Sequence, residues 1–229
     1  MAISRVKTWA NGEVLSHTDL NAEFDNILNN ASSLISPLTA NLAAGGFNIT
    51  GLGTTTLGWN LIETKTASAS ASISFTSGLS TSYNNYAIKI SNFTPVTDAT
   101  NLVMRISQAS TFLTGASDYA WVRHVWGSGG SDATVVDAAD TGIVMAGSLS
   151  NTSGRVFEST IFFGQPADAL GFKTFAFDNA YFTSGSELAR TVGAGMFQLN
   201  NAAIDGVGFL MSAGNISVGT FTLYGLRKV

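Results

Sequence analysis

The sequence contains no cysteine, and this absence excludes disulfides, thiolate metal sites and cysteine nucleophiles. Charged residues are also scarce, at 11% of the 229 residues against roughly 25% in ordinary globular proteins. The net charge is -4, so the chain lacks the basic stripe that nucleic-acid binding requires. No run approaches the roughly 20 apolar residues of a membrane span, and the N-terminus has no apolar signal-peptide core. We therefore expect neither nucleic acid nor membrane as a partner.

Catalytic side chains are few as well. His124 is the only histidine in the long C-terminal part of the chain, and no G-x-S-x-G nucleophile elbow is present. The carboxylates show no spacing that selects a glycosidase pair, and Asp132, Asp137 and Asp140 lack the rhythm of a calcium loop. We predict no enzyme, no catalytic or metal-binding residues and no cofactor.

One stretch near the N-terminus has a helical pattern. Ser16 is a good N-cap with Asp19 three residues later, and Pro37 disfavours helix at Ser36, so we predict a helix over 18–36. Apolar residues recur in steps of 4, 3, 4, 3 and 4, the a/d alternation of a coiled coil, at Leu20, Phe24, Ile27, Ala31, Leu34 and Leu38. The helix is rich in asparagine, a poor helix former, and must therefore pack its apolar stripe against a partner or against its own domain.

The residues around this helix carry a family resemblance. The pattern W-x-x-G-x-x-L-x-x-x-D-L-N-x-x-F-x-x-I begins at Trp9 and resembles the opening of many bacteriophage tail-fibre and virion-appendage proteins. GGFNITGL at 45–52 resembles the small repeat that follows this opening, and FTLYGLRKV at the C-terminus resembles the last strand of their β-rich heads. The match covers about the first fifty residues well. It implies that Trp9, Gly12 and Leu15 dock on the virion.

The remainder of the chain predicts a neck and a β-rich head. Residues 39–58, rich in glycine and threonine, are expected to form a neck in which three copies wind together. From Trp59 onward the apolar residues alternate with polar ones, as at Ile88 and Ile90. Strands are expected at 155–164, 172–178, 194–200, 206–213 and 216–227. The predicted fold is mainly β: a segment 1–38 with an amphipathic helix, a neck 39–58, and an antiparallel, jelly-roll-like sandwich head 59–229.

The segment 118–126, DYAWVRHVW, is the densest aromatic part of the head, and we expect long loops at 108–118 and 127–141 to flank it. Alternation places one set of its side chains in the core and the other on the surface, without deciding which. Aromatic rings can stack on sugars, so the candidate ligand contacts are Tyr119, Trp121, Arg123 and Trp126. Core packing is the favoured interpretation of these residues.

Together these patterns favour a bacteriophage virion structural protein made in the host cytoplasm. We expect a homotrimeric tail fibre or appendage, joined through Leu20, Phe24, Ile27 and Leu34, with a head that faces the host surface. Its partners would be further copies of itself, other virion proteins of the tail, portal adaptor, neck or capsid, and a host glycan or receptor. The alternative is a purely architectural decoration protein of the neck, capsid or tail that binds no host molecule. A glycan-cleaving tail protein is the weaker alternative.

Overall fold

The computed structural model describes residues 7–14, 16–30 and 58–227, and the chain divides into two compact units, Met1–Thr54 and Thr55–Val229. The first unit contains the helix α1, His17–Asn30. The helix thus begins one residue before its predicted start. The rest of its predicted length, with Leu34 and Leu38, lies outside the described residues, as do Leu15 and the expected neck up to residue 57.

Ser16 caps the start of α1 as its side chain predicts. The Asp19 backbone N–H donates to Ser16 Oγ at 3.1 Å, and Ser16 Oγ donates to Asp19 Oδ2 at 2.8 Å. The Leu20 backbone N–H then donates to the Ser16 carbonyl at 3.1 Å, which closes the first helical turn. Free N–H groups at a helix start are therefore satisfied locally, and Asp19 also complements the positive end of the helix dipole.

Lys7 fastens the preceding segment to the helix. Its Nζ lies 2.6 Å from Glu13 Oε1 and 2.5 Å from Asp19 Oδ2, and its backbone N–H donates to Glu23 Oε1 at 2.7 Å. Hydrogen bonds to Asp19 and Glu13 raise the pKa of Lys7 above its ordinary value and lower the pKa of both carboxyls. Residues 7–14 are consequently held against α1 by polar contacts.

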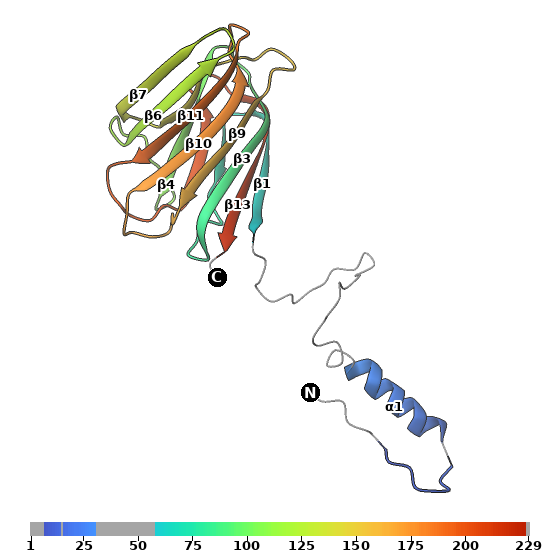
Figure 1. Ribbon diagram of the computed structural model, residues 1–229. Coiled ribbons are helices and arrows are strands. Elements are labelled where there is room, and N and C mark those ends of the chain that lie inside the picture. Colours follow the sequence, from blue (N-terminus) through green and yellow to red (C-terminus); the bar gives the residue numbers. More distant parts are fainter. Residues whose placement is uncertain (1–6, 15, 31–57, 228–229) are drawn as a thin grey trace. The chain divides into compact units, whose positions relative to one another are not determined.

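The second unit is built from antiparallel strands, which confirms a mainly β fold. Its large sheet has the order β1-β13-β3-β9-β10-β11-β6-β7. Figure 1 shows these eight strands side by side, with β4 of the second sheet behind them. Their bounds are β1 Trp59–Ser70, β13 Ile216–Arg227, β3 Tyr83–Pro95, β9 Phe157–Gly164, β10 Lys173–Phe182, β11 Leu188–Phe197, β6 Tyr119–Gly127 and β7 Asp132–Asp140.

The smaller sheet has the order β2-β12-β4-β5, and β8 also pairs with β4. Its bounds are β2 Ser72–Phe75, β12 Gly206–Met211, β4 Thr100–Gln108, β5 Thr111–Phe112 and β8 Ile143–Leu149. Side chains of the two sheets share one core, in which the Phe209 ring of β12 lies 5.3 Å from the Phe221 ring of β13.

Alternation along each strand of the large sheet separates a core face from an outer face. On β10, Phe175, Phe177 and Tyr181 are buried, while Ala176 and Ala180 between them are exposed. This period of two is the geometry that the sequence pattern predicted. The predicted C-terminal strands lie close to the observed ones, although β11 begins six residues earlier, at Leu188 rather than at 194.

The prediction of a long loop over 127–141 is wrong, because residues 132–140 form the edge strand β7. The glycine-rich turn before it is tight: the Gly127 N–H donates to the Ser131 carbonyl at 2.7 Å, and Gly130 has φ +93°. Val135 and Val136 then pair with Arg123 and Val122 of β6. β7 lies at the edge of the sheet and is largely exposed, so its sequence needs little apolar alternation. Its aspartates are residues typical of loops, and they led to the wrong prediction. The other expected loop, 108–118, is interrupted only by the two-residue strand β5.

Candidate functional site

The N-terminal residues that carry the family resemblance are only partly explained by local structure. Gly12 has φ +85° beside a turn closed by a Glu13 N–H bond to the Ala10 carbonyl at 3.1 Å, so a glycine is favoured there. Trp9 is half-buried, and its Nε1 has no hydrogen-bond partner among the described residues. An indole N–H without a partner is unusual. Virion docking through Trp9, Gly12 and Leu15 stays a prediction.

The described part of the α1 stripe is open to solvent. Leu20 is 41% exposed and Phe24 is 55% exposed, although both lie at positions that the a/d pattern assigns to a partner surface. Ile27 belongs to the same stripe by sequence, while its side chain lies outside the described part of the chain, as does Leu34. A helix with large exposed apolar side chains is incomplete by itself.

Strand β6 places Tyr119 and Trp121 in the core. The Tyr119 hydroxyl accepts the Ile106 N–H at 2.9 Å and donates to the Leu113 carbonyl at 3.1 Å, and burial raises the pKa of Tyr119 to about 12. Trp121 Nε1 donates to Asp140 Oδ2 at 2.9 Å. Both rings therefore have structural partners on the inside of the head, where Tyr119 is fully buried and Trp121 is 8% exposed.

Arg123 also points to the core side of β6. Its guanidinium lies 5.4 Å from the centre of the Trp121 ring, and Nε and Nη1 are buried without a partner among the described residues. Burial lowers the pKa of Arg123. A Cβ built on Gly147 would lie 2.9 Å from Arg123 Nη2, so the glycine gives the guanidinium its space. We find no ligand role for Arg123 on the outer face.

The outer face of β6 carries Val122, His124 and Trp126. Trp126 is 44% exposed, and its ring centre lies 4.3 Å from that of His124. His124 is fixed by Asp132 Oδ1 at 2.6 Å from Nε2 and by Thr134 Oγ1 at 2.9 Å from Nδ1. Of the four candidate ligand contacts, Trp126 is the one with an open aromatic ring.

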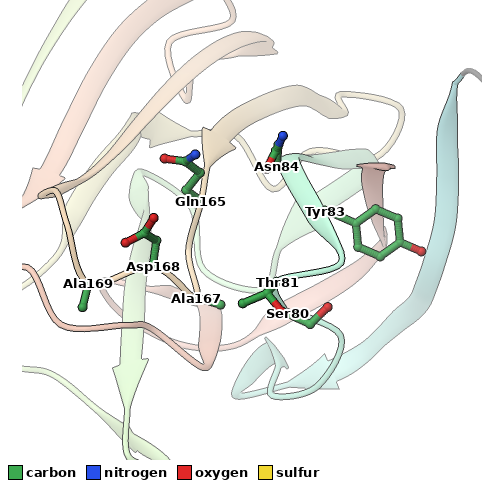
Figure 2. Close-up of a pocket in the computed structure, with 8 residues that line it drawn as sticks. All are labelled: Ser80, Thr81, Tyr83, Asn84, Gln165, Ala167, Asp168 and Ala169. Atoms are coloured by element: carbon green, nitrogen blue, oxygen red, sulfur yellow. The ribbon is translucent and has the colours of Figure 1, made fainter. Parts of the chain in front are cut away.

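A polar hollow of about 290 Å³ lies between the turn before β3 and the β9–β10 loop. Figure 2 shows Gln165 and Asp168 on one side of it and Ser80 on the other. The Tyr83 ring is turned away from them and packs against Gly225 and the Tyr86 ring, 5.7 Å away. The hollow thus offers hydrogen-bonding groups without the aromatic platform on which a sugar ring stacks.

Sequence reasoning missed a broad apolar area on the outer face of the large sheet. Phe162 is 48% exposed there, between the buried Ile161 and Phe163. Strict alternation turns the middle residue of an apolar triplet outward, so IFF at 161–163 contained the signal. This area contains two hollows.

Within 7–14, 16–30 and 58–227, no group of three or more histidine, aspartate or glutamate side chains is placed to hold a metal ion. No described helix is long and apolar enough to cross a membrane. Neither a family model, nor a curated protein, nor a solved structure matches the chain.

Proposed function

We propose that this protein is a bacteriophage virion structural protein, a homotrimeric tail fibre or appendage. Its N-terminal segment docks on other virion proteins, and residues 59–229 form a jelly-roll-like sandwich head that projects from the particle. The observation that carries the proposal is the open apolar stripe of α1, marked by Leu20 and Phe24. The stripe coincides with the sequence pattern that resembles virion-appendage proteins.

Other copies of α1 are the occupants that best fit this stripe. The 4-3 spacing suits a seam between parallel helices, and full burial stabilises by about 1.5–3 kcal/mol for each large side chain. The head has little need of the helix, because aromatic side chains of both its sheets already close its core. In a trimer the Leu20 and Phe24 side chains of all three copies would be buried. The free energy of this burial would offset the low helix propensity of the asparagine-rich segment.

The test of trimerisation is Phe24→Asp, which places a charge in the stripe. Asn21→Asp is the matched control, since it adds the same charge on the same turn at an exposed position beside the stripe. Light scattering at micromolar concentration should give a trimer for the natural chain and for the control, and a smaller particle for Phe24→Asp. A monomeric natural chain would refute the proposal.

Docking on the particle is tested separately with Trp9→Ala. We expect this variant to form trimers of normal mass and to be missing from purified virions, because only the docking surface has changed. Normal incorporation of Trp9→Ala would remove Trp9 from the docking element. The architectural alternative is distinguished by host binding, which it lacks.

Contact with a host saccharide is the second candidate function, and the open ring of Trp126 favours it. The ring is flanked by His124, Asp132 and Arg190, which can exchange hydrogen bonds with sugar hydroxyls. Binding to host surface polysaccharide should fall on Trp126→Ala with the fold unchanged by circular dichroism. If neither the natural chain nor the variant binds, the architectural role stands.

A further inference from the structure

An apolar row crosses the full width of the large sheet on its outer face. The strand register places one residue of each strand in this row, and none of the eight is charged. From β1 to β7 its members are Leu61, Tyr224, Ala87, Phe162, Ala176, Ala194, Val122 and Val136. Six of them are exposed, Tyr224 is half-buried and Ala87 is buried, and in Figure 1 these strands form an open layer. Single exposed apolar residues need no explanation, but a continuous row does.

The two ends of the apolar row differ in shape. At the β1 end, the Trp59 and Phe162 rings stand 6.1 Å apart beside a hollow of about 470 Å³. At the β7 end, a second hollow of about 390 Å³ is walled by small or flexible side chains such as Ala120, Ala194 and Met196. Thr174 and Ala194 line both hollows, so the two are continuous. The β1 end of the row therefore carries bulky aromatic side chains, and the β7 end is a groove lined by smaller ones.

Charge is segregated from the row. The charged residues on the outer face lie on its other half, where Arg190 binds Asp178 through two hydrogen bonds of 3.0 and 2.6 Å. Glu158 accepts the Asn92 N–H at 2.8 Å, and Asp132 pairs with His124. Among the residues lining the two hollows, only Asp137 is charged. A neutral surface can meet a copy of itself without like-charge repulsion.

The neutrality of the row and the unlike shapes of its two ends indicate a second copy as the occupant. Trp59 and Leu61 belong to β1, the first described strand of the second unit. If α1 joins three chains, as the proposed function holds, each head shares its assembly with two further copies of the same row. The local concentration of those copies is then far above that of any unrelated partner.

Resting on that proposed function, we propose that the apolar row is the contact between heads: the aromatic end around Trp59, Leu61 and Phe162 of one copy packs into the groove at Ala194, Val122 and Val136 of the next. Such a contact joins unlike surfaces, and a rotation by one third of a turn closes it into a ring of three. The partner is a second copy of this chain.

The absence of cysteine permits a direct test in the full chain. Ala176→Cys introduces a thiol in the row, and Ala180→Cys is the matched control on the same strand and the same outer face, among the charged residues. In a trimeric sample, maleimide should label Cys at 176 at least about tenfold more slowly than Cys at 180, after normalising both rates to denatured protein.

The possible outcomes distinguish a failure of the head contact from a failure of the proposed function. A trimer in which both thiols react equally fast overturns the head contact and leaves the trimeric appendage intact. A monomer by light scattering refutes the proposed function, and with it the head contact. Slow labelling that persists in a monomeric sample would mean that the chain's own residues cover the row, and would overturn the assignment to a second copy.

The pairing of unlike ends has its own test. Leu61 and Val136 lie on opposite edges of one sheet, roughly 34 Å apart along the sheet, because seven strand spacings of about 4.8 Å separate them. A short bis-maleimide should therefore link chains into covalent trimers when Leu61→Cys and Val136→Cys are combined, and neither single variant should be linked. Linked dimers from a single variant would show that like ends meet, and an unlinked double variant would show that these ends lie apart; either result overturns this arrangement.

Discussion

Tyr119→Phe removes one buried hydroxyl from the head, and with it the two hydrogen bonds that this hydroxyl makes. The Tyr119 side chain is fully buried, and its hydroxyl joins β6 to β4 through the Ile106 N–H and to the segment after β5 through the Leu113 carbonyl. Phenylalanine keeps the ring and leaves both backbone groups without their partner. Unsatisfied buried groups cost about 1–3 kcal/mol each, so for these two groups we expect a loss of about 2–6 kcal/mol in the free energy of unfolding.

The same hydroxyl should make stability depend on alkaline pH. Burial raises the pKa of Tyr119 to about 12, above the 10.0 of an exposed tyrosine. A raised pKa means that the neutral form is favoured in the folded state, so this contribution is complete below pH 10 and is lost as the pH rises toward 12. A pKa difference of about two between the unfolded and folded states corresponds to about 2.7 kcal/mol in the free energy of unfolding. The variant should lack this part of the alkaline decline.

The assay is urea unfolding followed by circular dichroism, at neutral pH and at a series of alkaline values. Tyr83→Phe is the control, because it removes the same atom from a partly exposed ring outside the apolar row, where we expect a change within about 0.5 kcal/mol. If Tyr119→Phe is as stable as the control and declines equally at high pH, the hydroxyl does not hold β6 and the core placement of this strand face is wrong.

Two further predictions concern local geometry. Ser16→Ala removes the cap of α1 and should lower its helix content, at a cost of about 0.5–2 kcal/mol; circular dichroism of the N-terminal segment measures this, and an unchanged helix signal would contradict the capping role. Gly193→Ala places a Cβ 2.5 Å from the Phe177 ring and 2.6 Å from the Val122 carbonyl oxygen. Because backbone cannot yield, we expect a loss of about 1–3 kcal/mol in urea unfolding, and an unchanged midpoint would show that β6 and β11 lie farther apart.

Local signals account for the features that the sequence predicted well. The start of α1 follows from two side chains three residues apart, Ser16 and Asp19, whose hydrogen bonds need no tertiary context. The strands of the C-terminal half were predictable for a similar reason, since alternation such as FAF at 175–177 encodes one buried face by itself. Features of this kind depend on neighbours in the chain.

The core side of β6 depended on neighbours in space. Its two faces carry aromatic residues of similar size, Trp121 on one and Trp126 on the other, so hydrophobicity does not choose between them. The choice is made by Ile106, whose N–H donates to the Tyr119 hydroxyl, and by Leu113, whose carbonyl accepts from it. The sequence analysis missed strand β7 for the same reason. β7 forms by pairing with β6, and nothing within residues 132–140 alone indicates that pairing.

The apolar row is the extreme case, since seven separate strand pairings create it. Its proposed role also explains why the contact between heads can be modest. Copies joined by their helices hold one another's heads at an effective concentration on the order of millimolar, so a contact worth about 4 kcal/mol suffices to close the ring. Trp59, Leu61 and Phe162 are each about half exposed, and covering what remains open contributes roughly 1 kcal/mol apiece. With the groove residues added, the row is sufficient when α1 is present and weak without it. Heads released from their helices should therefore separate on dilution, which keeps an uncharged surface from associating before the fibre has assembled.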